Sequence, residues 1–309
     1  MYLVDFRDVL LEKAKRQSAI KELQVHAHGH CIHLGRISYA CGWCFARREM
    51  FQVSFGTDCM CRNNCPYCFF GSDDEENIQG YLDNLNHLFA LSSQPHWKPD
   101  IISYNSYGET LQALTNGYED LFLKAALIVK RVEERHAYKA YKKIYTNGLL
   151  ADKETLAFLK RELDINEIRF HLSASHFSEN VYHNMQVASE MGFVVVVEEP
   201  SLLSNREKLF DMLFKIERIG VKHLDICEVE ITHSNIQRLH ALFPRGRMYK
   251  NRAYHLYDEG IVYDLMEEVI DKKYSFSVID CNSDRERFAR SQRDEALPLE
   301  DLEGVFAAP

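Results

Sequence analysis

The sequence predicts an α/β protein whose main domain is a partial (β/α)6-type TIM-like barrel with an N-terminal cysteine-rich extension. Apolar runs of strand length alternate with amphipathic runs of helix length, which favours parallel βα units wound with one hand. A group of three cysteines follows the first predicted strand, and parallel barrels carry their chemistry at the carboxyl ends of strands. We expect the extension at residues 1–49, the barrel at 50–293 and a polar tail at 294–309.

Apolar periodicity places the individual elements of the predicted barrel. In chain order, we expect strands at residues 51–55, 101–105, 143–146, 167–172, 193–197, 223–231 and 274–279, and helices at residues 78–91, 118–135, 152–159, 178–191, 205–219, 234–242 and 261–272. In the longest of these helices, Leu121, Ala125, Ile128 and Val132 recur at helical spacing on one face. That apolar face predicts a helix packed against a sheet.

Turn and capping residues agree with these boundaries. Asn147 and Gly148 form a turn signal directly after a predicted strand. Asp152 is a favourable N-cap for the next helix. Gly192 and Gly220 follow two helical segments, where glycine commonly ends a helix.

Composition narrows the class of protein and its partners. The chain has 309 residues, of which 46% are hydrophobic and 27% charged, as in a globular protein with ample core. Its formal net charge of −9 disfavours a nucleic-acid partner. No apolar run reaches membrane-spanning length, and the charged N-terminus lacks the apolar region of an export signal. We therefore expect a cytoplasmic protein with neither nucleic acid nor membrane as partner.

The most informative motif is a C-x3-C-x2-C loop formed by Cys61, Cys65 and Cys68, with an aromatic residue, Tyr67, before the last cysteine. Three thiolates at this spacing can bind three irons of a [4Fe–4S] cluster and leave the fourth iron open to a ligand. Zinc sites more commonly use two C-x2-C pairs or Cys/His pairs. The motif therefore predicts an iron–sulfur centre.

This loop resembles that of the radical S-adenosylmethionine (radical SAM) enzymes. The resemblance implies that the open iron chelates the amino and carboxylate groups of S-adenosylmethionine. It further implies reductive cleavage to a 5′-deoxyadenosyl radical, which abstracts hydrogen from a substrate. The cofactor would supply the difficult chemistry, and a reductase, flavodoxin or ferredoxin would supply the electron.

Further residues match the cofactor contacts that this resemblance implies. Radical SAM proteins usually carry Gly-Gly-Glu after the second strand, and Gly108, Glu109 and Thr110 stand there with Tyr107 in place of the first glycine. Glu109 would bind the methionyl ammonium. The remaining candidates for cofactor binding are Tyr67, Asn147, Ser173 and Ser175. Asn147 lies in a Thr-Asn-Gly turn that fits a plain turn equally well, and the two serines are candidates for the ribose hydroxyls.

A second set of cysteines lies outside this loop. Cys41 and Cys44 form a C-x2-C pair, and Cys281 follows a late strand. We favour an auxiliary [4Fe–4S] cluster on these three residues, with Cys31 or Cys59 as a possible fourth ligand. A structural zinc and ordinary buried thiols are the alternatives.

The order of several motifs is similar to a family of radical SAM proteins commonly labelled pyruvate formate-lyase-activating-enzyme-like. These motifs are the segment from His33 to Cys44, a Glu-x-Glu-x-Thr-x-x-Asn run at residues 228–235, and Cys281 followed by a basic run at residues 285–293. The resemblance covers most of the chain and implies fold and radical chemistry, but it says little about the substrate.

Three residues are candidates for direct roles in catalysis. Glu228 and Glu230 have the same parity on one predicted strand, so both would point to one face. There they could bind a polar substrate or act as a base, and an ion pair with an outer helix is an equal alternative. Cys227, like Cys281, is a candidate hydrogen-atom donor, as in radical epimerases.

We therefore expect an enzyme that cleaves S-adenosylmethionine and abstracts hydrogen from a small polar metabolite or natural-product intermediate. Epimerisation, dehydrogenation, rearrangement, cyclisation and sulfur insertion all remain open. One alternative is an activase that installs a glycyl radical in a protein. Another is a non-catalytic iron–sulfur or zinc redox sensor, which would have no need of the Gly108-Glu109 motif.

Overall fold

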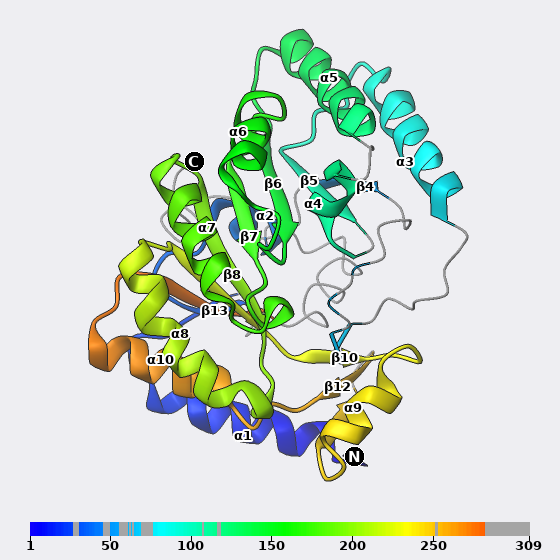
Figure 1. The fold of residues 1–309 in the computed structure, drawn as a ribbon. Helices are drawn as coiled ribbons and strands as arrows, with labels where there is room; N and C mark the ends of the chain where they lie inside the picture. The colour runs from blue at the N-terminus through cyan, green and yellow to red at the C-terminus, as the bar shows by residue number, and fades with distance from the viewer. Residues whose placement is uncertain are drawn as a thin grey trace. The chain divides into compact units, whose positions relative to one another are not determined.

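The computed structural model describes residues 1–26, 31–45, 50–55, 61, 63, 65–68, 77–106, 108–115, 119–250 and 253–281 (Figure 1). The chain divides into two compact units. Unit 1 comprises Met1–Arg47, Asn64–Gly71 and Val196–Ala308, and unit 2 comprises Arg48–Asn63, Ser72–Val195 and Pro309. Both have mixed α/β structure, which confirms the predicted class. The described residues of the expected extension, 1–49, form three strands and two helices, and these five elements belong to unit 1.

Unit 2 is built on four parallel strands in the order β7-β6-β5-β4. The strands are β4 (Met50–Phe55), β5 (Ile101–Ser106), β6 (Tyr141–Thr146) and β7 (Glu167–Phe170). The helices are α3 (Asn77–Ser92), α4 (Thr110–Ala113), α5 (Glu119–His136), α6 (Lys153–Arg161) and α7 (Glu179–Glu190), with a 3-10 turn η3 (Ser173–Ser175). Helices α3 and α5 lie side by side (Figure 1).

One face of these strands is apolar and lies against the helices. Tyr104, Ile144 and Ile168 are register partners on three neighbouring strands, and all are buried. The Tyr104 ring stacks on Phe122 of α5, with 6.3 Å between ring centroids. Strand side chains alternate between faces, so the residues between these positions lie on the opposite face, which is polar.

Several predicted boundaries are confirmed in atomic detail. The Asp152 side chain accepts a hydrogen bond from the Thr155 amide (2.8 Å) as the N-cap of α6. Gly148 has a φ of 80°, and a Cβ there would lie 2.5 Å from a methyl group of Val181. Glycine is therefore required at the turn that follows β6.

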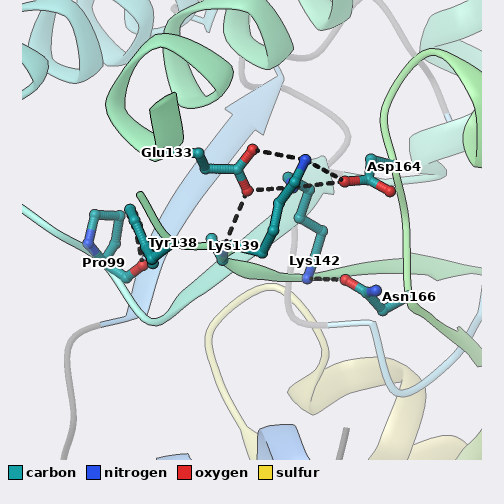
Figure 2. A network of polar contacts seen from close by, with 8 residues as sticks. Pro99, Glu133, Tyr138, Lys139, Lys142, Asp164 and Asn166 are labelled. Carbon is teal, nitrogen blue, oxygen red and sulfur yellow. Dashed lines mark hydrogen bonds and ion pairs between the residues drawn. The ribbon is translucent and has the colours of Figure 1, made fainter. Parts of the chain in front are cut away.

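A buried network joins the end of α5 to the start of β6 (Figure 2). The Lys142 ammonium contacts a Glu133 carboxylate oxygen at 2.6 Å and an Asp164 oxygen at 3.3 Å. The same Glu133 oxygen accepts a hydrogen bond from the Ala140 amide (2.9 Å). Because Lys142 and Glu133 are both buried, removing either partner would leave the other with only its longer ionic contact, Lys142 with Asp164 or Glu133 with Lys139 (3.4 Å). This network is a structural anchor at the amino ends of the strands.

The described strands of unit 1 form two sheets. The larger one has the order β2-β3-β13-β9-β8, and its strand β8 (Val194–Pro200) begins at the last residues of unit 2. Its other strands are β2 (Gln24–His26), β3 (Cys31–Leu34), β9 (His223–Cys227) and β13 (Ser277–Cys281). β8, β9 and β13 run parallel, and β3 and β2 add to β13 in antiparallel pairs. The helices are α1 (Phe6–Ala19), α2 (Tyr39–Phe45), α8 (Arg206–Ile219) and α10 (Ile261–Lys272), with a 3-10 turn η4 (Leu203–Asn205).

The smaller sheet corrects one predicted element. It has the strand order β1-β11-β12-β10, and helix α9 (Ile236–Leu242) connects β10 to β11 in the chain. Its strands are β1 (Tyr2–Leu3), β10 (Val229–Ile231), β11 (Arg247–Lys250) and β12 (Tyr254–Leu256). The single strand expected at residues 223–231 is wrong, because β9 and β10 belong to different sheets. Val229 and Ile231 leave the larger sheet to bury against Leu256 and its neighbours.

The strand order in the described part of each unit is open, and no ring of strands closes within either unit. The curvature of a partial barrel therefore stays a prediction. Among the described residues, every helix is too short or too polar to traverse a lipid bilayer.

Candidate cofactor and substrate site

The residues of the C-x3-C-x2-C loop are divided between the two units. Cys61 belongs to unit 2, and Cys65 and Cys68 belong to unit 1. All three are half-buried thiols. The Cys68 amide donates to the Cys65 carbonyl (3.1 Å), which closes a tight turn around Tyr67.

Two residues of α9 and its N-terminal flank hold the backbone of this turn. The Asn235 side-chain amide donates to the Tyr67 carbonyl (3.1 Å) and to the Glu230 carbonyl (2.8 Å), and its oxygen accepts from the Thr232 amide (2.8 Å). The Arg238 guanidinium donates to the Cys68 carbonyl (2.8 Å). Asn235 is fully buried. Sequence reasoning assigned no role to either residue, although Asn235 ends the Glu-x-Glu-x-Thr-x-x-Asn motif.

In unit 2 the structure brings Glu109 together with the turn after β6. One Glu109 oxygen accepts from the Leu111 amide (3.0 Å) and the Thr146 hydroxyl (2.6 Å), and the other accepts from the Asn147 amide (2.6 Å). Burial raises the pKa of Glu109, and these hydrogen bonds oppose the rise. Each of its partners among the described residues is neutral. The carboxylate is thus buried, and the described residues hold it in place without a cation.

The neighbouring candidates have local structural roles as well. Gly108 has a φ of 116°, a conformation that a residue with a side chain rarely adopts. Thr110 is the buried first residue of α4. Ser173 and Ser175 are buried in η3 after β7, and the Ser175 hydroxyl donates to the Leu172 carbonyl (2.9 Å). Their predicted contacts with a cofactor ribose stay predictions.

In unit 1, thiols and a carboxylate share one face of the larger sheet. The Cys41 thiol of α2 donates to Asp225 of β9 (3.1 Å). Cys227 lies two residues further along β9 and is the register partner of Cys281 on β13. A hydrogen bond with Cys227, followed by burial, raises the pKa of Cys281. Cys44 is half-buried one turn after Cys41.

These thiols do not converge on a metal-binding geometry. Within the described side chains there is no group of three or more His, Cys, Asp or Glu residues placed to hold a metal ion. This holds for the C-x3-C-x2-C loop as well as for the second set of cysteines. Cys59 and the side chain of Cys31, the two possible fourth ligands, lie outside the described residues. The cysteine donor set of the loop matches the chemistry of an iron–sulfur cluster.

The two candidate glutamates do not lie on one strand. Glu228 falls between β9 and β10, and its carboxylate contacts the Lys13 ammonium of α1 (2.6 Å) and the Tyr249 hydroxyl (2.6 Å). Glu230 is half-buried on β10, on the face opposite to Val229. The parity argument that placed both side chains on one face loses its basis with the strand break. Glu228 has the ion pair with a helix that the sequence left as an alternative.

Asp258 extends the buried polar group around Glu228. Burial first, and the negative charge of Glu228 second, raise the pKa of Asp258 to about 7, while Lys13 opposes the rise. One Asp258 oxygen accepts from the Gly260 amide (2.8 Å). The described residues give the other oxygen, which is buried, no hydrogen-bond partner.

Comparison with known proteins yields a likeness at the level of fold. No family profile and no curated protein matches the sequence. The structure is similar to SuiB of Streptococcus suis crystallised with S-adenosylmethionine, with a TM-score of 0.50 and 12% identity over 76% of this chain and 50% of that chain. Two further SuiB structures have lower scores. SuiB bound to the precursor peptide SuiA has a TM-score of 0.46 at 11% identity, covering 74% of this chain and 48% of that chain. A further structure of SuiB has a TM-score of 0.47 at 11% identity, covering 90% of this chain and 60% of that chain.

At 12% identity, the similarity to SuiB concerns the fold alone. This chain spans about half the length of the SuiB chain with the highest of these scores. The parallel α/β fold described above is thus also the fold of a protein crystallised with S-adenosylmethionine.

Proposed function

We propose that the protein is a radical SAM enzyme that reductively cleaves S-adenosylmethionine and abstracts hydrogen from a small polar metabolite or natural-product intermediate. The observation that carries this proposal is Glu109. It is buried at the carboxyl end of β5 and held by neutral donors only among the described residues. A buried carboxylate without a cation favours a cationic ligand, and the methionyl ammonium is such a ligand. The cysteine loop and the fold likeness to SuiB support the same proposal.

The residues of the chain have distinct roles in this proposal. Cys61, Cys65 and Cys68 would hold a [4Fe–4S] cluster, which when bound supplies the electron that breaks a carbon–sulfur bond of S-adenosylmethionine. Glu109 binds the ammonium, and Thr146 with the Asn147 amide fixes the carboxylate in one orientation. Gly108 lets the backbone turn at the position before Glu109 without strain.

Cys227 is proposed as a hydrogen-atom donor to the substrate radical, with Cys281 beside it. The register pairing of the two strands supports this proposal, because it gives each half-buried thiol a neighbouring thiol. An auxiliary [4Fe–4S] cluster on Cys41, Cys44 and Cys281 is the competing use of Cys281. It would need ligands beyond those that the described residues bring together.

The proposal includes a cytoplasmic location, a small-molecule substrate and electron delivery by a reductase, flavodoxin or ferredoxin. Its direct test is anaerobic incubation of the reconstituted protein with dithionite and S-adenosylmethionine. The expected products are 5′-deoxyadenosine and methionine.

A further inference from the structure

The strands of unit 2 carry charged side chains on the face opposite to the helices. Ser103, Lys143 and Glu167 are register partners on β5, β6 and β7, and all three are buried. Two residues nearer the carboxyl ends, Tyr145 is the register partner of Arg169. Parallel strands that are covered on both faces normally have continuous apolar sequences. Charged residues on this face therefore point to a role other than packing.

The charges on this face do not balance. Glu167 is satisfied by Arg169 (2.6 Å from Nε) and by the Tyr141 hydroxyl (3.0 Å). Lys143 is only 5% exposed, and its ammonium donates to the Tyr145 hydroxyl (2.8 Å) and lies 4.8 Å from the centroid of that ring. Among the described residues, no carboxylate forms an ion pair with Lys143. Within the described part of the chain, this buried ammonium has no counter-ion.

A buried ammonium has three N–H donors, and a neutral phenol accepts only one of them. Burial of a charge without a counter-ion is unfavourable, and an anion at this position would offset the cost. The chain carries a formal net charge of −9, so its overall field repels anions. Uptake of an anion at Lys143 would therefore depend on local contacts.

Exposure on this face increases toward the carboxyl ends of β5 and β6, whereas Arg169 of β7 stays buried. Ser103 and Lys143 are buried, whereas Asn105, Tyr145 and His171 are half-buried. The Lys143 ammonium points along β6 to Tyr145, whose ring stacks on His171 with 6.0 Å between centroids. Glu109 and Asn147 follow the carboxyl ends of β5 and β6 in the same unit. A ligand would reach Lys143 from the end of the strands where these residues lie.

We propose that this face binds an anionic group of the substrate, a carboxylate or a phosphate, with the Lys143 ammonium as the charged contact and Tyr145 as the residue that positions it. The inference rests on the proposed function, because it assigns a substrate class to the same site. It restricts the small polar metabolite to one that carries an acidic oxygen group.

Calorimetric titration of the reconstituted protein with succinate and with inorganic phosphate, in low-salt buffer, tests the proposal. We expect the parent to bind one of the two probes, and the probe that binds identifies the carboxylate or the phosphate. Lys143→Met should weaken that binding by about tenfold or more, the equivalent of one charge-assisted hydrogen bond. Lys143→Arg should restore most of it, since it restores the charge.

Lys139→Met is the matched control, because the Lys139 side chain is 70% exposed and pairs with Glu133 and Asp164. Its anion binding should equal that of the parent. Lys143→Gln, which keeps a donor for Tyr145, replaces the Met variant if thermal melting shows that the latter is unfolded. Binding of neither probe by the parent, or equal binding by the parent and the uncharged variants, would overturn the inference. Anion binding does not require cleavage of S-adenosylmethionine, so the two proposals fail separately.

Discussion

The side-chain amide of Asn235 donates a hydrogen bond of 3.1 Å to the backbone carbonyl of Tyr67, 168 residues away in the chain. This contact joins the turn between Cys65 and Cys68 to the start of α9. Since Asn235 also contacts Thr232 and Glu230, the position of the turn depends on the small sheet of unit 1.

Replacing Asn235 should therefore impair cluster assembly. Asn235→Asp keeps the acceptor for the Thr232 amide but places a carboxylate beside two carbonyl oxygens. We expect a loss of about 1–3 kcal/mol in the free energy of unfolding of unit 1. We also expect fewer irons per chain after reconstitution and an altered electron paramagnetic resonance spectrum of the reduced protein. Asn180→Asp, at an exposed position of α7, is the control. Parent-like iron content and spectrum in Asn235→Asp would show that the contact does not position the loop.

Glu109→Gln should weaken S-adenosylmethionine binding by about tenfold or more, because the amide lacks the charge that the ammonium requires. Equilibrium dialysis of the reconstituted protein with labelled S-adenosylmethionine measures this. The iron content should stay at the parent value. Glu154→Gln, an exposed residue in the first turn of α6, controls for loss of one negative charge. Equal affinity of Glu109→Gln and the parent would remove Glu109 from the binding site.

Asp258 makes the stability of unit 1 depend on pH. Burial and the charge of Glu228 raise its pKa to about 7, with a smaller rise from Asp280, and Lys13 and the Gly260 amide oppose the rise. In an unfolded chain, the pKa of Asp is about 3.9. Between these two pKa values, Asp258 is protonated in the folded protein and ionised in the unfolded chain. The free energy of unfolding therefore falls as the pH rises from about 3.9 to about 7, and above that range Asp258 causes no further change.

Asp258→Asn should thus differ little from the parent at about pH 4 and become progressively more stable than the parent up to about pH 7. Urea titrations of both proteins across this range give the difference in the free energy of unfolding. Groups that do not interact with Asp258 titrate alike in both proteins and cancel in that difference. A difference that is constant with pH would show that Asp258 keeps an ordinary pKa.

Iron analysis decides between the two uses of Cys281. An auxiliary cluster predicts about eight irons per chain, and a Cys41→Ala/Cys44→Ala/Cys281→Ala variant would then retain about four. If Cys281 is instead a free thiol beside Cys227, the parent protein itself should contain about four irons per chain. One equivalent of zinc beside four irons would indicate a structural zinc site.

Much of this fold follows from local sequence signals. Asp152 and Gly148 mark α6 and its preceding turn because their side-chain and backbone preferences act within a few residues. The break between Cys227 and Val229 has no such signal, because both halves have strand-like residues and only their pairing partners differ. The antiparallel strands β2 and β3 are also short, and they depend on non-local pairing: β3 pairs with β13, and β2 pairs with β3.

The contacts of the candidate site likewise fall into those that the sequence could predict and those that it could not. The approach of Glu109 to Asn147 is predictable, because the two residues follow neighbouring parallel strands. The ion pair of Glu228 with Lys13 joins residues that are 215 positions apart, so periodicity contains no information about it. Asn235 was visible as part of a motif, but its contact with Tyr67 required the structure.

The cysteine loop is proposed to support cleavage of S-adenosylmethionine. The most direct measurement is quantification of 5′-deoxyadenosine and methionine after anaerobic incubation of the reconstituted parent and Cys65→Ala with dithionite. We expect both products in equal amounts from the parent and none above background from Cys65→Ala, with similar circular dichroism spectra for the two proteins. Formation of 5′-deoxyadenosine by Cys65→Ala at the parent rate, or no product from a parent with a full complement of iron, would show that the loop does not carry this reaction.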